Sequence, residues 1–229
     1  MIFREVRILF SSVGLHARTK LACQAAVGAW IVLFYCGPQL WPLFPAWPAP
    51  MLAVDRWVPF QPAWALVYQS VFIVHTLAFW LPRDRDAVKT YARNVAAAYA
   101  CGAVVFWLYP TLSPRPVESG SWIHHWFITA VDGPRNAFPS LHAAMGLLAV
   151  LAVCGHLRAC RVSAWWRVAL AFWWVALLYS TLATRQHGLL DLLAGIFLGL
   201  ICFALPAITT QTRPCHDPLD TSPDPSPVR

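Results

Sequence analysis

Residues 135–150 read RNAFPSLHAAMGLLAV, a stretch in which His142 stands at the start of a long apolar run. Residues 180–195 read STLATRQHGLLDLLAG, where His187 and Asp191 precede a second apolar run. Both runs are long enough to enter a membrane. An ionisable residue at the edge of such a segment indicates a functional site, because burying it in lipid is costly. The two stretches therefore bear on both fold and function.

The rest of the sequence indicates a membrane protein with several spans. The chain has 229 residues, of which 59% are hydrophobic and 12% charged, whereas soluble domains usually have about 25% charged residues. Several apolar runs reach the roughly 20 residues needed to cross a bilayer. We therefore expect an all-α fold, a polytopic membrane bundle of about six transmembrane helices. The expected spans are residues 21–37, 62–81, 91–112, 138–156, 165–184 and 186–206.

The chain divides into a membrane domain and two polar ends. Residues 1–20 are predicted to form a basic cytoplasmic N-terminus, and residues 21–211 the six-span domain. Residues 212–229 are polar and rich in proline, a composition typical of disorder, so we expect a disordered cytoplasmic tail. No internal repeat is evident.

Two long connections between spans are rich in aromatic residues. Residues 38–61 combine proline with tryptophan, which favours an ordered loop at the membrane surface. Within the connection at 113–137, an interfacial helix is predicted. The residues expected to share its apolar face are Trp122, Ile123, Trp126 and Phe127.

The distribution of basic residues predicts the orientation. Cytoplasmic loops carry an excess of Lys and Arg, and with six spans both termini lie on one side of the membrane. Of the 17 basic residues, all but four fall on the side of the termini, which we therefore place in the cytoplasm. Both histidines fall on the other side, so the site is expected to be extracytoplasmic (periplasmic or lumenal). The four outer basic residues are Arg56, Arg115, Arg135 and Arg185.

His187 and Asp191 have the spacing of a nucleophile and its orienting partner. Residues four apart share one face of a helix. A carboxylate there can accept the proton from one imidazole nitrogen and leave the other nitrogen able to attack. The alternative is a histidine at a helix start with Asp191 acting only as a favourable N-terminal charge.

Ser140 and His142 are expected at the start of a helix. Ser140 follows Pro139 and is placed near the N-cap. The free N–H groups of a helix N-terminus can bind an anion, and His142 in the first turn can face the same anion. The alternative is an interfacial histidine without a role.

The two stretches together suggest phosphoryl transfer. One histidine can attack phosphorus while the other protonates the leaving oxygen, and the planar guanidinium of arginine suits phosphate. We expect no metal and no cofactor, since no CxxC or Cys/His ligand spacing appears. The catalytic residues are expected to be His187, His142 and Asp191. The expected phosphate-binding residues are Arg115, Arg185, Ser140 and Arg135.

The motifs PSLH and HGLLD resemble the second and third signatures, PSGH and SRxxxxxHxxxD, of the type 2 phosphatidic acid phosphatase superfamily, which includes the vanadium haloperoxidases. VDRWVPFQPAWALVYQS, YPTLSPRP and NAFPSLHAA look like the branch that contains inositol phosphorylceramide synthases. The resemblance implies a membrane helical bundle in which His187 becomes transiently phosphorylated. It also implies that Asp191 orients this nucleophile and that His142 is the general acid and base.

Three positions depart from the signatures. The first signature, KxxxxxxRP, keeps Arg115 and Pro116, but Leu108 stands in the lysine position. In the third signature Thr181 occupies the arginine position, where Arg185 could substitute if that turn is helical. In the second signature Leu141 replaces glycine.

We expect an integral membrane enzyme that cleaves a phosphate ester or pyrophosphate of a lipid at the extracytoplasmic face through a phosphohistidine. Water as acceptor makes it a phosphatase. A hydroxyl acceptor makes it a lipid head-group phosphotransferase of the inositol phosphorylceramide synthase type. The non-enzymatic alternative is a lipid-binding or transport protein that retains an anion site. We expect the partners of the protein to be a lipid phosphate substrate, a possible hydroxyl acceptor and the membrane, without nucleic acid. The oligomeric state is left open.

Overall fold

The computed structural model describes residues 2–116, 121–129 and 132–204. The tail predicted at 212–229 lies outside the described residues, as does the end of the last predicted span.

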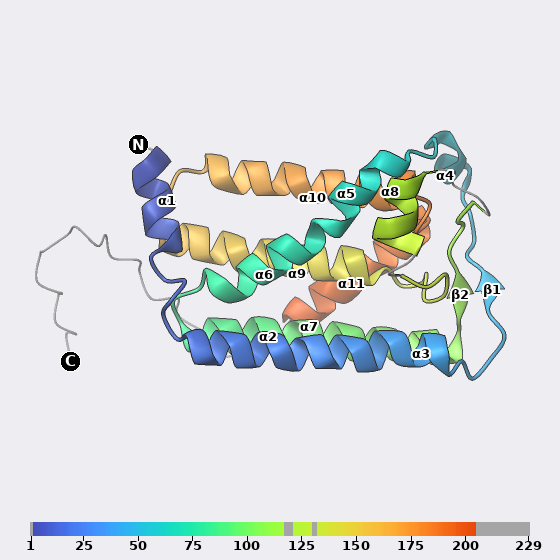
Figure 1. Ribbon diagram of the computed structural model, residues 1–229, viewed down its shortest axis with the longest axis horizontal. Helices are drawn as coiled ribbons and strands as arrows, with labels where there is room; N and C mark the ends of the chain where they lie inside the picture. Colours follow the sequence, from blue (N-terminus) through green and yellow to red (C-terminus); the bar gives the residue numbers. More distant parts are fainter. Residues whose placement is uncertain (1, 117–120, 130–131, 205–229) are drawn as a thin grey trace, which may run out of the picture.

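The long helices lie side by side along the longest axis of the molecule (Figure 1). Helix α1 (Ile2–Phe10) lies at one end of the bundle. The opposite end carries β1 (Trp47–Pro48), β2 (Thr111–Leu112) and α4 (Ala53–Trp57), and we call it the loop end. The histidine-bearing turns lie at the loop end.

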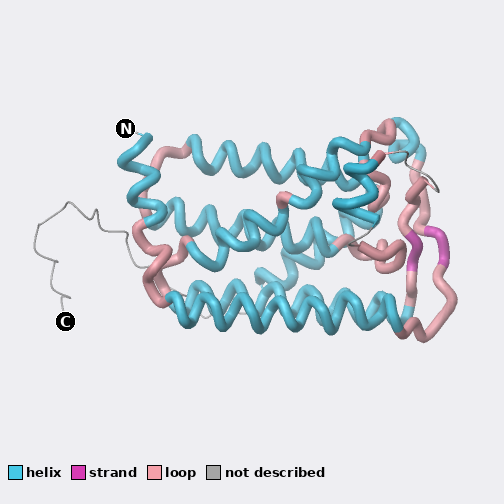
Figure 2. Tube along the Cα trace, viewed as in Figure 1, coloured by secondary structure: helices cyan, strands magenta, loops and turns pink. Residues whose placement is uncertain are grey.

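Helix dominates the described chain, and most of the loops lie at the ends of the bundle (Figure 2). Besides α1 and α4, the helical elements are α2 (Ala17–Ile31), η1 (Val32–Cys36), α3 (Gly37–Leu40), η2 (Pro62–Trp64), α5 (Ala65–Gln69), α6 (Val71–Trp80), α7 (Arg85–Leu108), α8 (Trp122–His124), η3 (His125–Thr129), α9 (Leu141–Ala159), α10 (Trp165–Ala183) and α11 (Leu189–Ala204).

Within the described residues, four helical segments are long and apolar enough to cross a membrane. Each lies at a predicted span, and α11 is a shorter apolar helix at a fifth. α7 covers the sixth but carries charged residues throughout its first half. Six spans in total therefore stay a prediction. The four segments are Ala17–Leu40, Pro62–Trp80, Leu141–Ala159 and Trp165–Ala183.

Helix caps move two of the predicted boundaries. The span predicted from residue 138 becomes helical only at Leu141, directly after the predicted N-cap, because the Ser140 hydroxyl accepts a hydrogen bond from the Ala143 amide at 3.3 Å. α7 begins ahead of the predicted residue 91, because the Asp84 carboxylate accepts from the Asp86 amide at 3.2 Å. Capping rather than hydropathy sets where these helices start.

The all-α prediction misses one small β ladder at the loop end. β1 and β2 pair in parallel, with Trp47 opposite Thr111. The Trp47 amide donates to the Pro110 carbonyl at 2.9 Å, and the Ala49 amide donates to the Leu112 carbonyl at 3.0 Å. A strand of two residues is too short to show an alternating pattern, so the sequence holds no signal for it. The ladder ties together two loops far apart in the chain.

The interfacial helix is present in part. Trp122, Trp126 and Phe127 are exposed. Ile123 packs inward against Ala65 and Tyr68, so its prediction on the same face as these three residues is wrong. The segment is a single α turn followed by the π-helical η3, and the 3.6-residue period does not hold across it.

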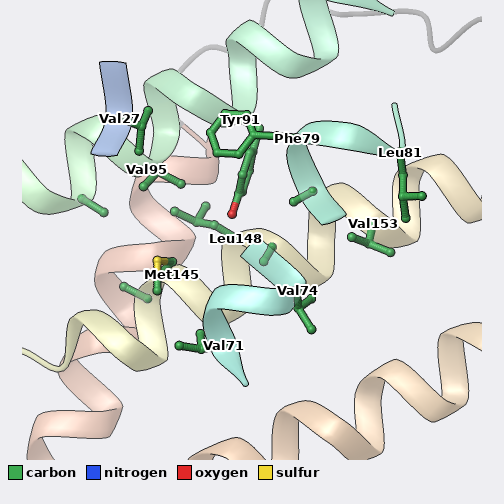
Figure 3. Close-up of a cluster of buried hydrophobic side chains, with 14 of the residues drawn as sticks. Val27, Val71, Val74, Phe79, Leu81, Tyr91, Val95, Met145, Leu148 and Val153 are labelled. Atoms are coloured by element: carbon green, nitrogen blue, oxygen red, sulfur yellow. The ribbon is translucent and has the colours of Figure 1, made fainter. Parts of the chain in front are cut away.

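α9 lies at the centre of the bundle. Of its apolar window 67% is buried, compared with 22% for α10. Met145 and Leu148 of α9 lie among side chains of α6 and α7 such as Val74 and Val95 (Figure 3). Because α9 is central, the other helices pack around the helix that carries His142.

Polar side chains buried between the helices are paired. His75 Nδ1 lies 2.6 Å from the Tyr91 hydroxyl and so links α6 to α7. The Lys20 ammonium donates to the carbonyls of Ser12 and Trp80, at 2.7 and 2.6 Å. His75 and Lys20 thus each have a partner, as a low-dielectric interior favours.

α11 packs directly against the backbone at the start of α9. A Cβ atom at Gly195 would lie 2.1 Å from the Ser140 carbonyl oxygen, and one at Gly199 would lie 3.2 Å from the Ala144 carbonyl oxygen. Two glycines four residues apart allow this contact, which is the small-residue packing used between membrane helices. The contact brings the start of α11 beside the start of α9.

Gly195→Ala is expected to lower the melting temperature of the protein purified in detergent. The added methyl group overlaps a backbone oxygen, and overpacking of this kind typically costs about 1–3 kcal/mol. The matched control is Gly28→Ala in α2, where a Cβ meets nothing within 4 Å. Equal melting temperatures for the two variants would contradict the close approach.

Candidate active site

The structure brings the two predicted catalytic histidines together at the loop end. His142 lies in the first turn of α9, and His187 lies in the turn between α10 and α11. Their ring centroids are 6.1 Å apart. Reacting atoms approach to roughly 3–3.5 Å and proton-transfer partners to about 2.6–3.2 Å. Two rings at this separation can therefore contact one phosphate group from two sides.

The His187 ring is held in one tautomer. Its Nδ1 lies 2.8 Å from the Ala137 carbonyl oxygen. A carbonyl only accepts, so Nδ1 carries the proton and Nε2 keeps its lone pair. The residue lies outside both neighbouring helices, and burial lowers its pKa to about 3, with the nearby His142 acting in the same direction. The ring is neutral at neutral pH, as a nucleophile must be.

Asp191 lies near His187 without bonding to it. Its Oδ2 is 3.9 Å from His187 Nδ1, beyond hydrogen-bond distance, and accepts from the Gly188 amide at 2.8 Å. The Ala137 carbonyl oxygen accepts the hydrogen bond from His187 Nδ1 instead. This arrangement matches the alternative in which Asp191 acts at the N-terminus of α11, and it fixes the turn that carries His187.

His142 presents one nitrogen to the site. Its ring stacks on Tyr68 with centroids 4.1 Å apart, and its Nδ1 lies 3.1 Å from the Tyr68 hydroxyl. Within the described part of the chain, the buried His142 Nε2 has no hydrogen-bond partner. This atom is available to a substrate.

Ser140 is the N-cap of α9, as the sequence predicts. Its side chain is fully buried and accepts from Ala143, while its backbone amide donates to the Asp191 carbonyl at 3.0 Å. Ser140 thus joins the starts of α9 and α11 and orients the first turn, from which His142 projects.

Arg115 lies beside the histidines. Its guanidinium donates to the carbonyls of Asp132 and Gly133, each at 2.8 Å, and lies 3.4 Å from the Asp132 carboxylate. The charges that act on His187 include those of Asp132 and Arg115. Arg115 is therefore within electrostatic range of the histidine pair.

The other two arginines hold loops. Arg185, in the left-handed conformation with φ of 57°, donates to the carbonyls of Asp55 and Val58, each at 2.8 Å. Arg135 donates to the Gln39 carbonyl at 3.2 Å. Both guanidinium groups bind backbone oxygens, and their binding of phosphate stays a prediction.

The family of the chain follows from comparison with known families. The family model of the PAP2 superfamily matches residues 43–205, well over half of the chain. The chain belongs to the PAP2 superfamily. No curated protein and no solved structure matches it. The match includes both histidine-bearing stretches and supports a phosphatase-type function. Together with the four apolar helices, PAP2 membership fits an integral membrane protein.

Two positions that depart from the PAP2 signatures differ in their surroundings: Leu108 is exposed and Thr181 is buried. Leu108, in the lysine position, ends α7 with an exposed side chain. Thr181, in the arginine position, is buried, and its hydroxyl donates to the Leu178 carbonyl at 2.8 Å. The Thr181 carbonyl also accepts from the amides of Gln186 and His187. In this PAP2 protein Thr181 therefore shapes the turn that carries His187.

Asp55 is a structural residue of the site that sequence reasoning missed. Its buried carboxylate accepts from the amides of Leu52 and Leu189, at 2.7 and 2.8 Å. It therefore caps α11 from across the loop end. Leu189 is 134 residues away in the chain, so no local pattern could have identified this contact.

Other features of the described residues lie apart from the histidine pair. A cavity of about 210 Å³ lies between the start of α7, the end of α9 and Phe203 of α11, and none of the predicted site residues lines it. Among the described residues, no group of three or more His, Cys, Asp or Glu side chains is placed to hold a metal ion. The candidate chemistry is therefore concentrated at the loop end.

Proposed function

We propose that the protein is a membrane enzyme that cleaves a lipid phosphate ester or pyrophosphate through a phosphohistidine intermediate. One observation carries the proposal: the centroids of two imidazole rings lie 6.1 Å apart, His142 Nε2 has no hydrogen-bond partner among the described residues, and the bond of His187 Nδ1 to Ala137 leaves a lone pair on His187 Nε2. PAP2 membership supports a phosphatase-type reaction.

In the first step, His187 Nε2 attacks phosphorus with its lone pair and forms the N–P bond. The bond from phosphorus to the leaving oxygen breaks, and its electron pair takes the proton carried by His142 Nε2. His142 becomes neutral as the alcohol departs. General acid catalysis of this kind typically contributes about 10²–10⁴-fold to the rate.

In the second step, the oxygen of water or of an acceptor hydroxyl attacks phosphorus and gives its proton to His142 Nε2. The N–P bond breaks and its electron pair returns to His187. The enzyme regains its starting state and releases free phosphate or a new phosphate ester. His142 thus acts as acid and then as base.

Three features support binding of the phosphate. Arg115 adds positive charge beside the two rings. The first turn of α9, capped by Ser140, directs its N-terminus toward the loop end, where an anion is favoured. Arg185 and Arg135 border the same loops and add to the positive potential.

The surface of the loop end favours a lipid substrate at the membrane interface. Exposed tryptophans are enriched where headgroups meet water, and several lie here. Because 13 of the 17 basic residues fall on the predicted side of the termini, our proposal has this end outside the cytoplasm and the termini inside. The exposed tryptophans are Trp41, Trp47, Trp57, Trp122 and Trp126.

His187→Ala is expected to abolish turnover. The protein would be purified in detergent and offered a panel of radiolabelled lipid phosphates in the presence of a chelator. Removing a nucleophile should lower kcat by about 10³-fold or more. In wild type, a brief reaction should trap acid-labile, alkali-stable phosphohistidine that is absent from the variant.

The control is His125→Ala, which removes an exposed histidine of η3 and should keep wild-type turnover. Activity that survives His187→Ala would refute the assigned nucleophile. No release or transfer by wild type across the panel would favour the non-enzymatic alternative, a lipid-binding or transport protein.

A second candidate is a lipid head-group phosphotransferase of the inositol phosphorylceramide synthase type. Its support is the likeness of PSLH and the neighbouring motifs to that branch, together with the burial of His187 away from bulk water. Transfer predicts that adding polyol or lipid alcohols converts labelled free phosphate into labelled esters. Unchanged products at saturating acceptor would leave hydrolysis as the reaction.

The proposed orientation predicts opposite labelling of two cysteine variants in a chain without native cysteines. Trp126→Cys, in η3 at the loop end, should react with a membrane-impermeant maleimide in intact cells. Lys89→Cys, near the start of α7, should react only after permeabilisation. The reverse pattern would overturn the orientation.

A further inference from the structure

A buried carboxylate lies behind His142. Asp132 accepts hydrogen bonds from the hydroxyls of Tyr35 and Tyr68, the latter at 3.0 Å. Arg115 lies 3.4 Å from the same carboxylate. Asp132 belongs to none of the motifs that identify the histidines, and Tyr68 is 64 residues away from it.

The chemistry of the groups determines which one donates in each hydrogen bond of this cluster. A carboxylate only accepts, so the single proton of the Tyr68 hydroxyl goes to Asp132. The Tyr68 oxygen can then only accept from His142 Nδ1, 3.1 Å away. His142 Nδ1 therefore carries a proton. The Nε2 of the same ring is left without a partner among the described residues.

The orientation of the ring is held as well as its tautomer. The His142 ring stacks on the Tyr68 ring with centroids 4.1 Å apart and an interplanar angle of 27°, and the centroid of the Phe72 ring lies 6.1 Å away at an interplanar angle of 80°. A ring clamped in this way keeps Nε2 in a fixed direction, and the centroid of the His187 ring lies 6.1 Å from that of His142. Tyr68 thus contacts His142 in two ways, by stacking its ring on the imidazole and by bonding its hydroxyl to Nδ1.

We propose that Tyr68 and Asp132 are positioning residues that hold His142 in the Nδ1–H tautomer, with Nε2 directed at the leaving oxygen. The role in turnover rests on the proposed function. His142 carries a positive charge when it acts as the acid, next to the positive Arg115. The Asp132 carboxylate, joined to the ring through one hydroxyl, stabilises that charge. This is the logic by which a buried aspartate orients a catalytic histidine.

Tyr68→Phe is the decisive variant, because it keeps the stacked ring and removes only the hydroxyl. A lipid phosphate has a strongly basic leaving oxygen that needs a proton, whereas an aryl phosphate such as 4-nitrophenyl phosphate has a weakly basic one. With loss of positioning, kcat for the lipid phosphate should fall about ten-fold or more, as part of the general-acid contribution. The rate with the aryl phosphate should change little.

The matched control is Tyr35→Phe, which also removes a hydroxyl bonded to Asp132 but leaves the contact between Tyr68 and His142. Its effect on lipid phosphate turnover should be smaller. In a His142→Ala background, Tyr68→Phe should cause no further loss, because a residue that acts through His142 is then without effect. Equal slowing with both substrates, or losses that add, would overturn the proposal.

A second measurement does not depend on turnover. In protein labelled with ¹⁵N-histidine, the ring signals missing from His142→Gln belong to His142, and their ¹⁵N shifts show which nitrogen is protonated. At a pH at which the His142 ring is neutral, wild type should show the Nδ1–H form, and Tyr68→Phe should lose it. An Nε2–H form in wild type would refute the positioning role. An inactive wild type that still shows the Nδ1–H form would refute the proposed function and leave the positioning of His142 intact.

Discussion

The close approach of α9 and α11 is the contact on which the rest of the site depends. Gly195 lies so near the Ser140 carbonyl that any side chain would overlap it, and the Ser140 amide bonds to the Asp191 carbonyl at 3.0 Å. Between helices in lipid there is little hydrophobic driving force, so close packing and polar contacts must hold them together. Because the contact lies at the starts of both helices, His142 and His187 face each other across it. Every chemical argument about the pair follows from this packing.

The polar residues of the loop end serve structure as much as chemistry. Buried backbone carbonyls need partners, and the guanidinium groups of Arg185 and Arg135 supply them. Asp55 does the same for the amide of Leu189 at the start of α11. These bonds hold irregular loops in place at the end of a helical bundle. A count of nearby arginines therefore overstates the number beside the proposed phosphate site, and of the three it is Arg115 whose charge acts on both histidines.

The two histidines differ because their surroundings differ. His187 Nδ1 donates a hydrogen bond to a backbone carbonyl, which is a neutral partner. His142 lies against Tyr68, which is bonded to the Asp132 carboxylate. A neutral partner suits a ring that attacks as an uncharged nucleophile, whereas an anionic one suits a ring that becomes charged as an acid. Environments that separate the roles of two similar titratable groups are a general means of assigning acid and nucleophile.

Hydropathy and local motifs predict much of this protein. Apolar runs located four candidate spans, and the Pro-Ser pair located the N-cap at Ser140. The spacing of His187 and Asp191 predicted that they lie together, though their direct bond is absent. The ladder of β1 with β2, the cap supplied by Asp55 and the contact of Tyr68 with Asp132 join residues far apart in the chain. The sequence by itself determined which segments are helices and which residues can do the chemistry, since both are local properties. Only the tertiary structure decided the partner of each polar group, because that choice depends on which distant backbones and side chains meet.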